Sequence, residues 1–137
     1  MIIIDTSVAV KWIIPGEDFE EQSFALMESH INYKDPIMVP DLFYYEISNT
    51  IATKTTFPTN KINSTLNKIY DLQLRSHISN AKEIIKTTLL ARKYKTSFYD
   101  MLYAVVAKHN KCQLITADRK FIEKTKFPHV IHISEYK

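Results

Sequence analysis

Residues 1–12 read MIIIDTSVAVKW, and this stretch decides the fold because its apolar run stops abruptly on an aspartate. A short, β-branched, uninterrupted segment such as residues 1–4 predicts a strand that is covered on both faces. Asp5 then stands at the carboxyl edge of this strand, where open α/β sheets hold their ligands. Asp5 could instead cap a helix that follows, because Asp is a good N-cap residue. Other acids along the chain must distinguish these two interpretations.

Short apolar runs alternate with helical stripes along the remaining sequence. We expect strands at residues 1–4, 37–39, 77–78, 114–115 and 130–133. We expect helices at residues 17–31, 42–54, 61–74, 80–94, 98–109 and 119–124. In the fourth of these helices, the side chains expected to face inward are Ile84, Ile85, Thr88 and Leu89. This alternation predicts an α/β fold in one domain, residues 1–137, with a parallel sheet that carries helices on both faces.

Composition excludes several kinds of site. Gly16 is the only glycine, so the sequence cannot build a P-loop, a G-x-G-x-x-G turn or a G-x-S-x-G nucleophile elbow. Cys112 is the only cysteine, which rules out an intrachain disulfide and a cysteine-based zinc cluster. The histidines are scattered, and the zinc-protease pattern H-E-x-x-H is absent. Because the sequence has neither a long apolar run nor a basic leader, we expect a cytoplasmic protein without a membrane segment.

Charge is distributed unevenly between the two halves of the chain. Residues 1–68 hold five lysines against nine acids, whereas residues 69–137 hold thirteen basic residues against six acids. Such asymmetry favours a polyanionic partner for the second half. Solvated helix faces in a lysine-rich protein would give the same pattern.

Asp100 lies in the segment SFYDMLYAVVA, within a strongly apolar helix. Helical spacing places it on one face with Ala104 and Ala107, and small residues beside an acid leave room for a ligand. A buried carboxylate requires a basic partner or a metal ion, and no Arg or Lys lies within four residues of Asp100. Simple exposure would conflict with so apolar a neighbourhood. We therefore expect Asp100 to be functional.

Two further acids repeat these patterns. Glu46, in PDLFYYEISNTI, lies on a helical face where an apolar residue is more usual, although alone it could be a partly solvated glutamate. Asp118, in QLITADRKF, follows the strand at residues 114–115 just as Asp5 follows the first strand. Asp118 could also be an N-cap, here for the helix at residues 119–124.

The four acids are predicted to meet at one edge of the sheet. Two follow strands and two lie on helices that should pack at the same edge, which is the topological switch point of the fold. Two unit charges about 4 Å apart repel by roughly 4 kcal/mol at an effective dielectric near 20, so such a cluster needs shared protons or bound cations. Oxygen ligands without Cys or paired His select Mg²⁺ or Mn²⁺ over zinc, and carboxylate-held Mg²⁺ most often serves phosphoryl chemistry.

The segments IIIDTSVAVKW, PDLFYYEISNTI, SFYDMLYAVVA and LITADRKF resemble, in this order, the PIN-domain ribonucleases. Within that family the chain is similar to the VapC-type toxins of prokaryotic toxin–antitoxin systems, and the resemblance covers nearly the whole chain. It implies a five-stranded parallel sheet flanked by helices, and a metal site that carries out catalysis. The acids implied for both the metal and the catalysis are Asp5, Glu46, Asp100 and Asp118. Ser7 and Thr116 would be polar supports that orient the acids or the attacking water.

The resemblance also implies an activity and partners. A Mg²⁺ or Mn²⁺ ion would activate a water molecule and offset the charge on the scissile phosphate of a structured RNA such as tRNA or rRNA. VapC-type members usually form homodimers and are encoded beside a VapB-type antitoxin, which is the expected protein partner. Basic residues of the second half would hold the RNA backbone. The candidates are Lys82, Lys86, Arg92, Lys93, Lys95 and Arg119.

Other functions are compatible with parts of the sequence. A phosphatase of the haloacid-dehalogenase type also begins with an apolar strand and an aspartate, but it needs a second aspartate where this chain has Ser7. A non-catalytic domain that binds RNA or protein would keep the fold and lack metal-dependent cleavage. Phe43, Tyr44 and Tyr45 could form a dimer or antitoxin surface, or they could simply pack their own helix.

Overall fold

The computed structural model describes residues 1–136, which form a five-stranded parallel sheet in the order β3-β2-β1-β4-β5. Its strands are β1 (Ile2–Ile4), β2 (Ile37–Pro40), β3 (Arg75–His77), β4 (Gln113–Thr116) and β5 (Val130–His132). β1 is the central strand, paired with β2 on one side and β4 on the other. All three of its isoleucines are buried, as expected for a strand covered on both faces. The α/β fold with a parallel sheet is therefore confirmed.

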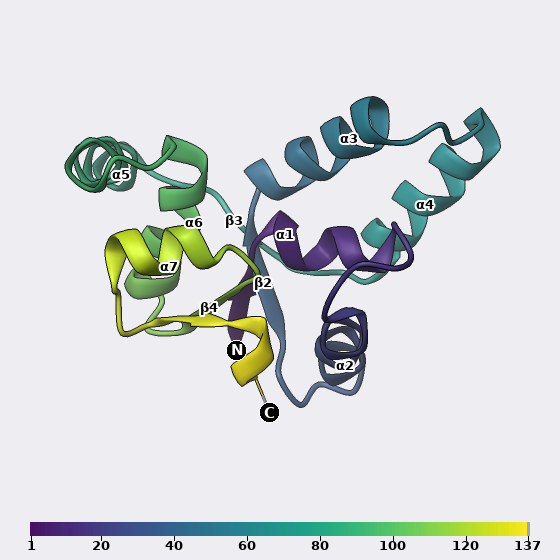
Figure 1. Cartoon of the computed structure of the whole chain (residues 1–137), viewed down its shortest axis with the longest axis horizontal. Coiled ribbons are helices and arrows are strands. Elements are labelled where there is room, and N and C mark those ends of the chain that lie inside the picture. The colour runs from purple at the N-terminus through teal and green to yellow at the C-terminus, as the bar shows by residue number, and fades with distance from the viewer. Residues whose placement is uncertain (137) are drawn as a thin grey trace.

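Helices cover both faces of this sheet. They are α1 (Thr6–Ala9), α2 (Glu20–Ile31), α3 (Leu42–Lys54), α4 (Thr59–Asp71), α5 (Ala81–Tyr94), α6 (Phe98–His109) and α7 (Arg119–Thr125). Short 3₁₀ turns follow at Val10–Trp12 and Ile133–Glu135. Figure 1 shows α2, α3 and α4 on one side of the strands, and α5, α6 and α7 on the other. The change of side falls between β1 and β4, which makes the carboxyl ends of these two strands the switch point.

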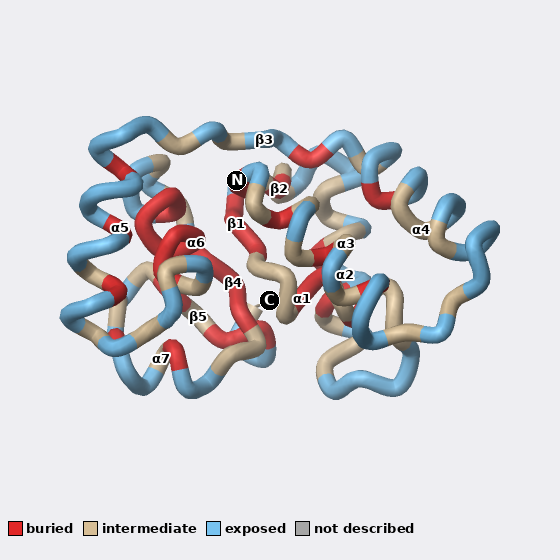
Figure 2. The backbone as a smooth tube through the Cα atoms, turned by 90° about the horizontal axis from the view of Figure 1, so that it is seen from above, coloured by how far each residue is buried: buried red, intermediate tan, exposed pale blue. Residues whose placement is uncertain are grey.

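α6 is the most deeply buried helix. Every residue from position 101 to position 107 is buried, and the helix contacts β1, β2 and β4. Figure 2 shows this buried centre in red, with α4 and much of α5 exposed at the periphery. None of the helices within residues 1–136 combines the length and the hydrophobicity that crossing a membrane requires.

Most predicted boundaries agree with the structure to within three residues. α2 begins at Glu20 rather than at residue 17, because Phe19 adopts a left-handed conformation with φ of 62° and ends the preceding loop. β3 ends at His77 and begins two residues earlier than predicted. α1 was not predicted, since four residues are too few to show a helical period.

The outward orientation of α5 contradicts the prediction for this helix. Ile85 and Leu89 are 61% and 62% exposed, and Ile84 and Thr88 are exposed as well. The buried stripe consists instead of Glu83, Thr87 and Ala91. Two stripes with helical spacing run along this segment. The more hydrophobic stripe was predicted to face inward, and that prediction was wrong.

Glu83 explains why the polar stripe of α5 faces inward. Its carboxylate receives a 2.8 Å hydrogen bond from the His77 ring and completes a capping box with Asn80 at the start of the helix. The hydroxyl of Thr87 donates to the Glu83 carbonyl oxygen at 2.7 Å, so this polar group is also satisfied. Small, buried Ala91 then lets α5 pack closely on α6. The inward stripe is polar but hydrogen-bonded, and burying it leaves the isoleucines and Leu89 outside.

Candidate active site

Strand register brings Asp5 beside Thr116. β1 and β4 pair in parallel with Ile4 opposite Ile115, so the next residue of each strand emerges at the same place on the carboxyl edge. The Thr116 hydroxyl donates to Asp5 Oδ2, and the Ser7 hydroxyl donates to Asp5 Oδ1. Both oxygens of this carboxylate are therefore oriented by hydroxyl groups, one from the last residue of β4 and one from the helix that follows β1.

Backbone amides hold the two hydroxyls in turn. Ala117 N–H donates to Ser7 Oγ at 2.9 Å, and Asp118 N–H donates to Thr116 Oγ1 at 3.0 Å. Each hydroxyl therefore accepts from the β4–α7 turn while it donates to Asp5. The network fixes the position of the carboxylate without neutralising its charge.

Asp5 and Asp118 occupy equivalent positions but make different contacts. Each is the residue before a helix, yet the Asp5 side chain makes no capping hydrogen bond. Asp118 Oδ1 accepts a 3.1 Å hydrogen bond from Phe121 N–H and caps α7. The capping interpretation is therefore wrong for Asp5 and correct for Asp118.

The pKa values of three acids are raised, and burial is the main cause for each. The pKa of Asp5 is raised from its ordinary value of 3.8 to about 6, mainly by burial. The charges of Asp100 and Asp118 also raise this pKa, and the hydrogen bonds from the Ser7 and Thr116 hydroxyls lower it. A carboxylate with this pKa holds a proton more readily than a solvated one, unless a cation replaces that proton.

Asp100 links Asp5 to the remaining acids. Burial raises the pKa of Asp100, the Ser97 hydrogen bond lowers it, and the charge of Asp118 raises it. Burial also raises the pKa of Glu46, where the charge of Asp100 adds to the effect. Charge effects thus link all four predicted acids. The charge of Asp100 raises the pKa of both Asp5 and Glu46, and the charge of Asp118 raises the pKa of both Asp5 and Asp100.

Tyr103 is a site residue whose role the sequence did not reveal. Its hydroxyl donates to Glu46 Oε1 at 2.6 Å, and this hydrogen bond lowers the pKa of Glu46 against the effect of burial. The only sequence signal was a tyrosine three residues after Asp100 in a strongly apolar helix. A buried tyrosine hydroxyl usually needs a partner, and here the partner lies on α3.

The donor set fits Mg²⁺ or Mn²⁺ held mainly by water. No group of three or more His, Cys, Asp or Glu side chains within residues 1–136 is arranged to hold a metal ion by itself. Mg²⁺ commonly keeps several waters and binds through one or two carboxylates together with substrate phosphates. The clustered donors are all carboxylate oxygens, the ligand type that these ions prefer. A cation there would relieve the mutual repulsion that contributes to the raised pKa values.

The predicted basic residues are dispersed over the second half of the chain. Lys82 and Lys86 line a pocket near the carboxyl end of α6, together with Lys108 and His109. Lys95 lines a pocket that also contains Asp100 and Asp118 of the site. Arg92, Lys93 and Arg119 are exposed. Sequence reasoning missed Lys120 and Lys124, which line the same pocket as Lys95.

The aromatic run on α3 mostly packs its own helix. Phe43 is buried, and Tyr44 stacks on Tyr70 of α4 with 4.6 Å between ring centroids. Tyr45 is 67% exposed and is the only one of the three that is available to a partner.

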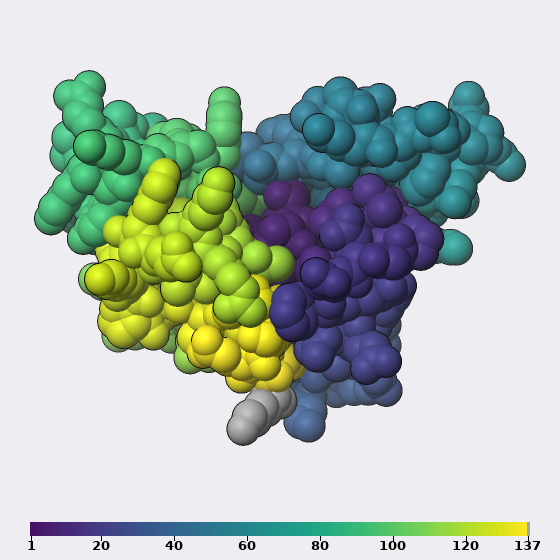
Figure 3. Space-filling view, viewed as in Figure 1, coloured from purple at the N-terminus to yellow at the C-terminus, as the bar shows by residue number. Residues whose placement is uncertain are grey.

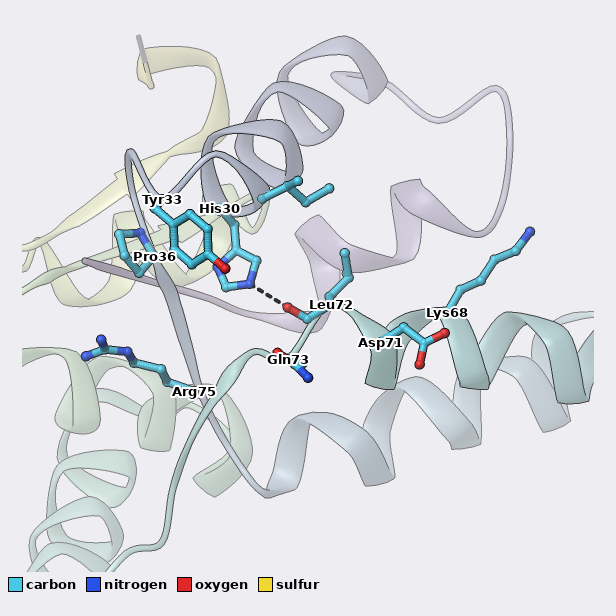
Figure 4. A pocket seen from close by; sticks show the side chains of 9 residues that line it. His30, Tyr33, Pro36, Lys68, Asp71, Leu72, Gln73 and Arg75 are labelled. Atoms are coloured by element: carbon cyan, nitrogen blue, oxygen red, sulfur yellow. Dashed lines mark hydrogen bonds between the residues drawn. The ribbon is translucent and has the colours of Figure 1, made fainter.

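A cavity outside the acidic site lies away from the four acids. It measures about 550 Å³ and is bordered by residues just before β2 and β3, at the amino edge of the sheet, among them His30, Lys68 and Arg75. Figure 4 shows the His30 ring directed toward the Leu72 carbonyl, at 2.7 Å. Its other ring nitrogen accepts from Ile37 N–H at 2.9 Å, so both nitrogens serve the structure. The acids instead lie at the carboxyl edge, where Figure 3 shows a hollow between the purple N-terminal segment, the blue-to-teal α3 and the yellow-green α7.

Comparison with known proteins agrees with this geometry. The family model described as PIN domain matches residues 2–127. No curated protein sequence matches the chain. The structure of FitAB bound to an IR36 DNA fragment superimposes with a TM-score of 0.76 at 16% identity, covering 100% of this chain and 98% of that one. A toxin–antitoxin complex from Klebsiella pneumoniae gives a TM-score of 0.71 at 14% identity, covering 99% and 100%. VapC20 from Mycobacterium tuberculosis is a toxin that cleaves the sarcin–ricin loop. Its structure gives a TM-score of 0.69 at 17% identity, covering 91% of this chain and 95% of that one. At such low identities these likenesses establish the fold.

Proposed function

This chain belongs to the PIN-domain family, and from that premise we propose that it is a metal-dependent endoribonuclease that acts as the toxin of a VapBC-type pair. The observation that carries the proposal is the position of Asp5. Its carboxylate is oriented by Ser7 and Thr116, makes no capping bond, and lies in the field of Asp100 and Asp118. A helix cap would not need this arrangement, whereas a ligand for a cation would.

The four acids divide the tasks of the proposed reaction among them. Asp5 and Asp100 would hold Mg²⁺ or Mn²⁺, and the bound ion would supply an activated water and offset charge on the scissile phosphodiester. Asp118 caps α7 with Oδ1 and lines a pocket together with Asp100, and its second oxygen would be available to the cation. Glu46, ordered by Tyr103, orients or deprotonates the attacking water. No side-chain nucleophile is required.

The proposed partners follow from the relatives and from the surface. Two of the similar structures are a toxin–antitoxin complex and FitAB on DNA, which supports a VapB-type antitoxin as the protein partner. The exposed Ile85 and Leu89 on α5 supply an apolar face that supports a homodimer. The proposed substrate is structured RNA such as tRNA or rRNA, and the proposed location is the cytoplasm.

Cleavage of RNA in the presence of defined ions tests the proposal. Purified protein should cut tRNA or rRNA with Mg²⁺ or Mn²⁺, stop with EDTA, and resume when the ion is restored. Asp100→Asn should abolish cleavage, whereas Glu28→Gln, a change of an exposed acid on α2, should leave it intact. Cleavage that persists in chelator, or that survives Asp100→Asn in a folded protein, contradicts the metal mechanism. RNA binding without cleavage in any ion would favour the non-catalytic binding module.

A further inference from the structure

Lysines from α7 and from the α5–α6 turn border the acidic site. A pocket of about 180 Å³ opens beside Asp100 and Asp118. Its remaining lining residues are Lys95, Thr96, Ser97, Lys120, Phe121 and Lys124. One small pocket therefore brings carboxylates that can bind a cation next to ammonium groups that can bind an anion.

We propose that Lys95, Lys120 and Lys124 form a lysine clamp that holds an RNA backbone phosphate next to the one that is cut. This inference rests on the proposed ribonuclease function and assigns the substrate contacts of the same site. Four carboxylates alone would repel a polyanion, and a bound divalent cation offsets only part of their charge. Ammonium groups on the border of the site supply the remaining attraction, and a lysine ammonium binds phosphate as a compact point charge.

Lys124 is held in place for this role. Its ammonium donates a 2.9 Å hydrogen bond to the Lys95 carbonyl oxygen, which ties α7 to the turn before α6. Its charge also acts on Asp100, whose pKa it lowers. Lys120 lies one helical turn earlier on α7, so both ammonium groups lie on the same side of this helix.

None of the clamp lysines forms an ion pair with another residue of the described chain. Within residues 1–136, the ion pairs closer than 4.0 Å are Lys11–Glu17 and His77–Glu83, and neither includes a clamp lysine. The hydrogen-bond acceptor of Lys124 is a neutral carbonyl oxygen, so the positive charge of this lysine is not neutralised and can attract an anion.

The second basic pocket is placed differently. Lys82, Lys86 and Lys108 surround it at the far end of α6, beside buried Glu83. Lys108 follows Asp100 by two turns of helix, a rise of about 12 Å. These lysines can contact a distant part of a bound RNA, but the clamp lysines lie next to the reacting phosphate.

Paired lysine variants test the clamp. Lys120→Ala/Lys124→Ala should weaken binding of a short fluorescent RNA about tenfold and should reduce the salt dependence of log Kd by about 0.7 for each phosphate that is no longer neutralised. KM for RNA should rise by a similar factor, with a smaller change in kcat. Lys120→Ala alone keeps the bond between Lys124 and the Lys95 carbonyl and should show an intermediate effect.

The control removes the same charge from the opposite edge of the sheet. Lys34→Ala/Lys68→Ala changes two exposed lysines near the amino ends of β2 and β3 and should leave affinity, salt slope and KM close to wild type. Equal behaviour of the two double variants overturns the clamp, even if the wild type is a nuclease. If the wild type fails to cleave but only the clamp variant loses affinity, the ribonuclease proposal fails and the RNA-binding clamp stands.

Discussion

The hydroxyl of Tyr103 on α6 donates a 2.6 Å hydrogen bond to Glu46 Oε1 on α3, across a sequence separation of 57 residues. Tyr103 is only 1% exposed, and both burial and the Glu46 charge raise its pKa, so it stays a proton donor at any physiological pH. The bond opposes the effect of burial on Glu46 and keeps this carboxyl ionised to lower pH than burial alone would allow.

Tyr103→Phe should shift the acidic limb of the pH–rate profile upward. The variant removes the donor that lowers the pKa of Glu46, so the glutamate holds its proton to higher pH. Melting temperature should also fall, because a hydrogen bond to a charged group typically contributes about 1.5–3 kcal/mol. Tyr99→Phe, on the exposed side of the same helix, is the control and should change neither quantity. An unaltered pH–rate profile in Tyr103→Phe would show that Glu46 does not take part as an ionised group.

Asp118→Asn and Asp118→Ala should separate the two tasks of Asp118. Asn caps a helix about as well as Asp, so Asp118→Asn should keep the melting temperature while cleavage is lost. Asp118→Ala removes the cap as well and should cost about 1 kcal/mol in urea unfolding. If both variants remain fully active, Asp118 is a cap and nothing more.

Asp5→Asn should stabilise the metal-free protein near neutral pH. The folded protein has an Asp5 pKa of about 6 against an ordinary value of 3.8, so between these values it binds more protons than the unfolded chain. Stability from this group is therefore present at low pH and is lost as pH rises from about 4 through 6. Wild type and Asp5→Asn should melt at similar temperatures at pH 4, and the variant should melt higher at pH 7. A lower melting temperature for the variant at pH 7 would contradict the pKa shift.

Stabilisation by Mg²⁺ or Mn²⁺ should weaken below about pH 6. A metal ion needs the deprotonated Asp5 carboxylate, and protons compete for it in this range. The increase in melting temperature caused by added Mn²⁺ should therefore shrink from pH 7 to pH 5 in the wild type. In Asp5→Asn it should be small at both pH values, and strong stabilisation of this variant by Mn²⁺ would exclude Asp5 as a ligand.

Charges placed on α5 should change association without changing the fold. Ile85→Lys and Leu89→Lys alter side chains that are 61% and 62% exposed, so the melting temperature of a dilute sample should stay nearly constant. If this face joins two copies, sedimentation equilibrium should show a shift from dimer to monomer. Lys93→Glu, which changes the charge at another exposed position of α5, should affect association less. A wild-type protein that is monomeric at all concentrations would refute the homodimer.

The sequence correctly predicted those elements whose hydrophobicity follows a pattern among neighbouring residues. β1 and α6 were recognised because their residues are almost uniformly apolar, and Asp5 and Asp100 stood out against those apolar surroundings. α5 was oriented wrongly because the partners that satisfy Glu83 lie in the preceding strand and turn. Tyr103 and Lys124 escaped notice for a related reason, since their importance comes from contacts with α3 and with the α5–α6 turn.

The central position of β1 has a consequence for synthesis of the protein on the ribosome. Of the five strands in this sheet, β1 is made first, yet it lies between β2 and β4, and β4 is completed only at Thr116. The hydrogen bond from Thr116 to Asp5 spans 111 residues, so this hydroxyl cannot orient the carboxylate until the segment up to β4 has been translated. Contacts this distant in sequence form late and slowly. A nascent chain that stalls before β4 would therefore hold Asp5 without the Thr116 hydroxyl that orients it, and the complete acidic site forms only after β4 has been made.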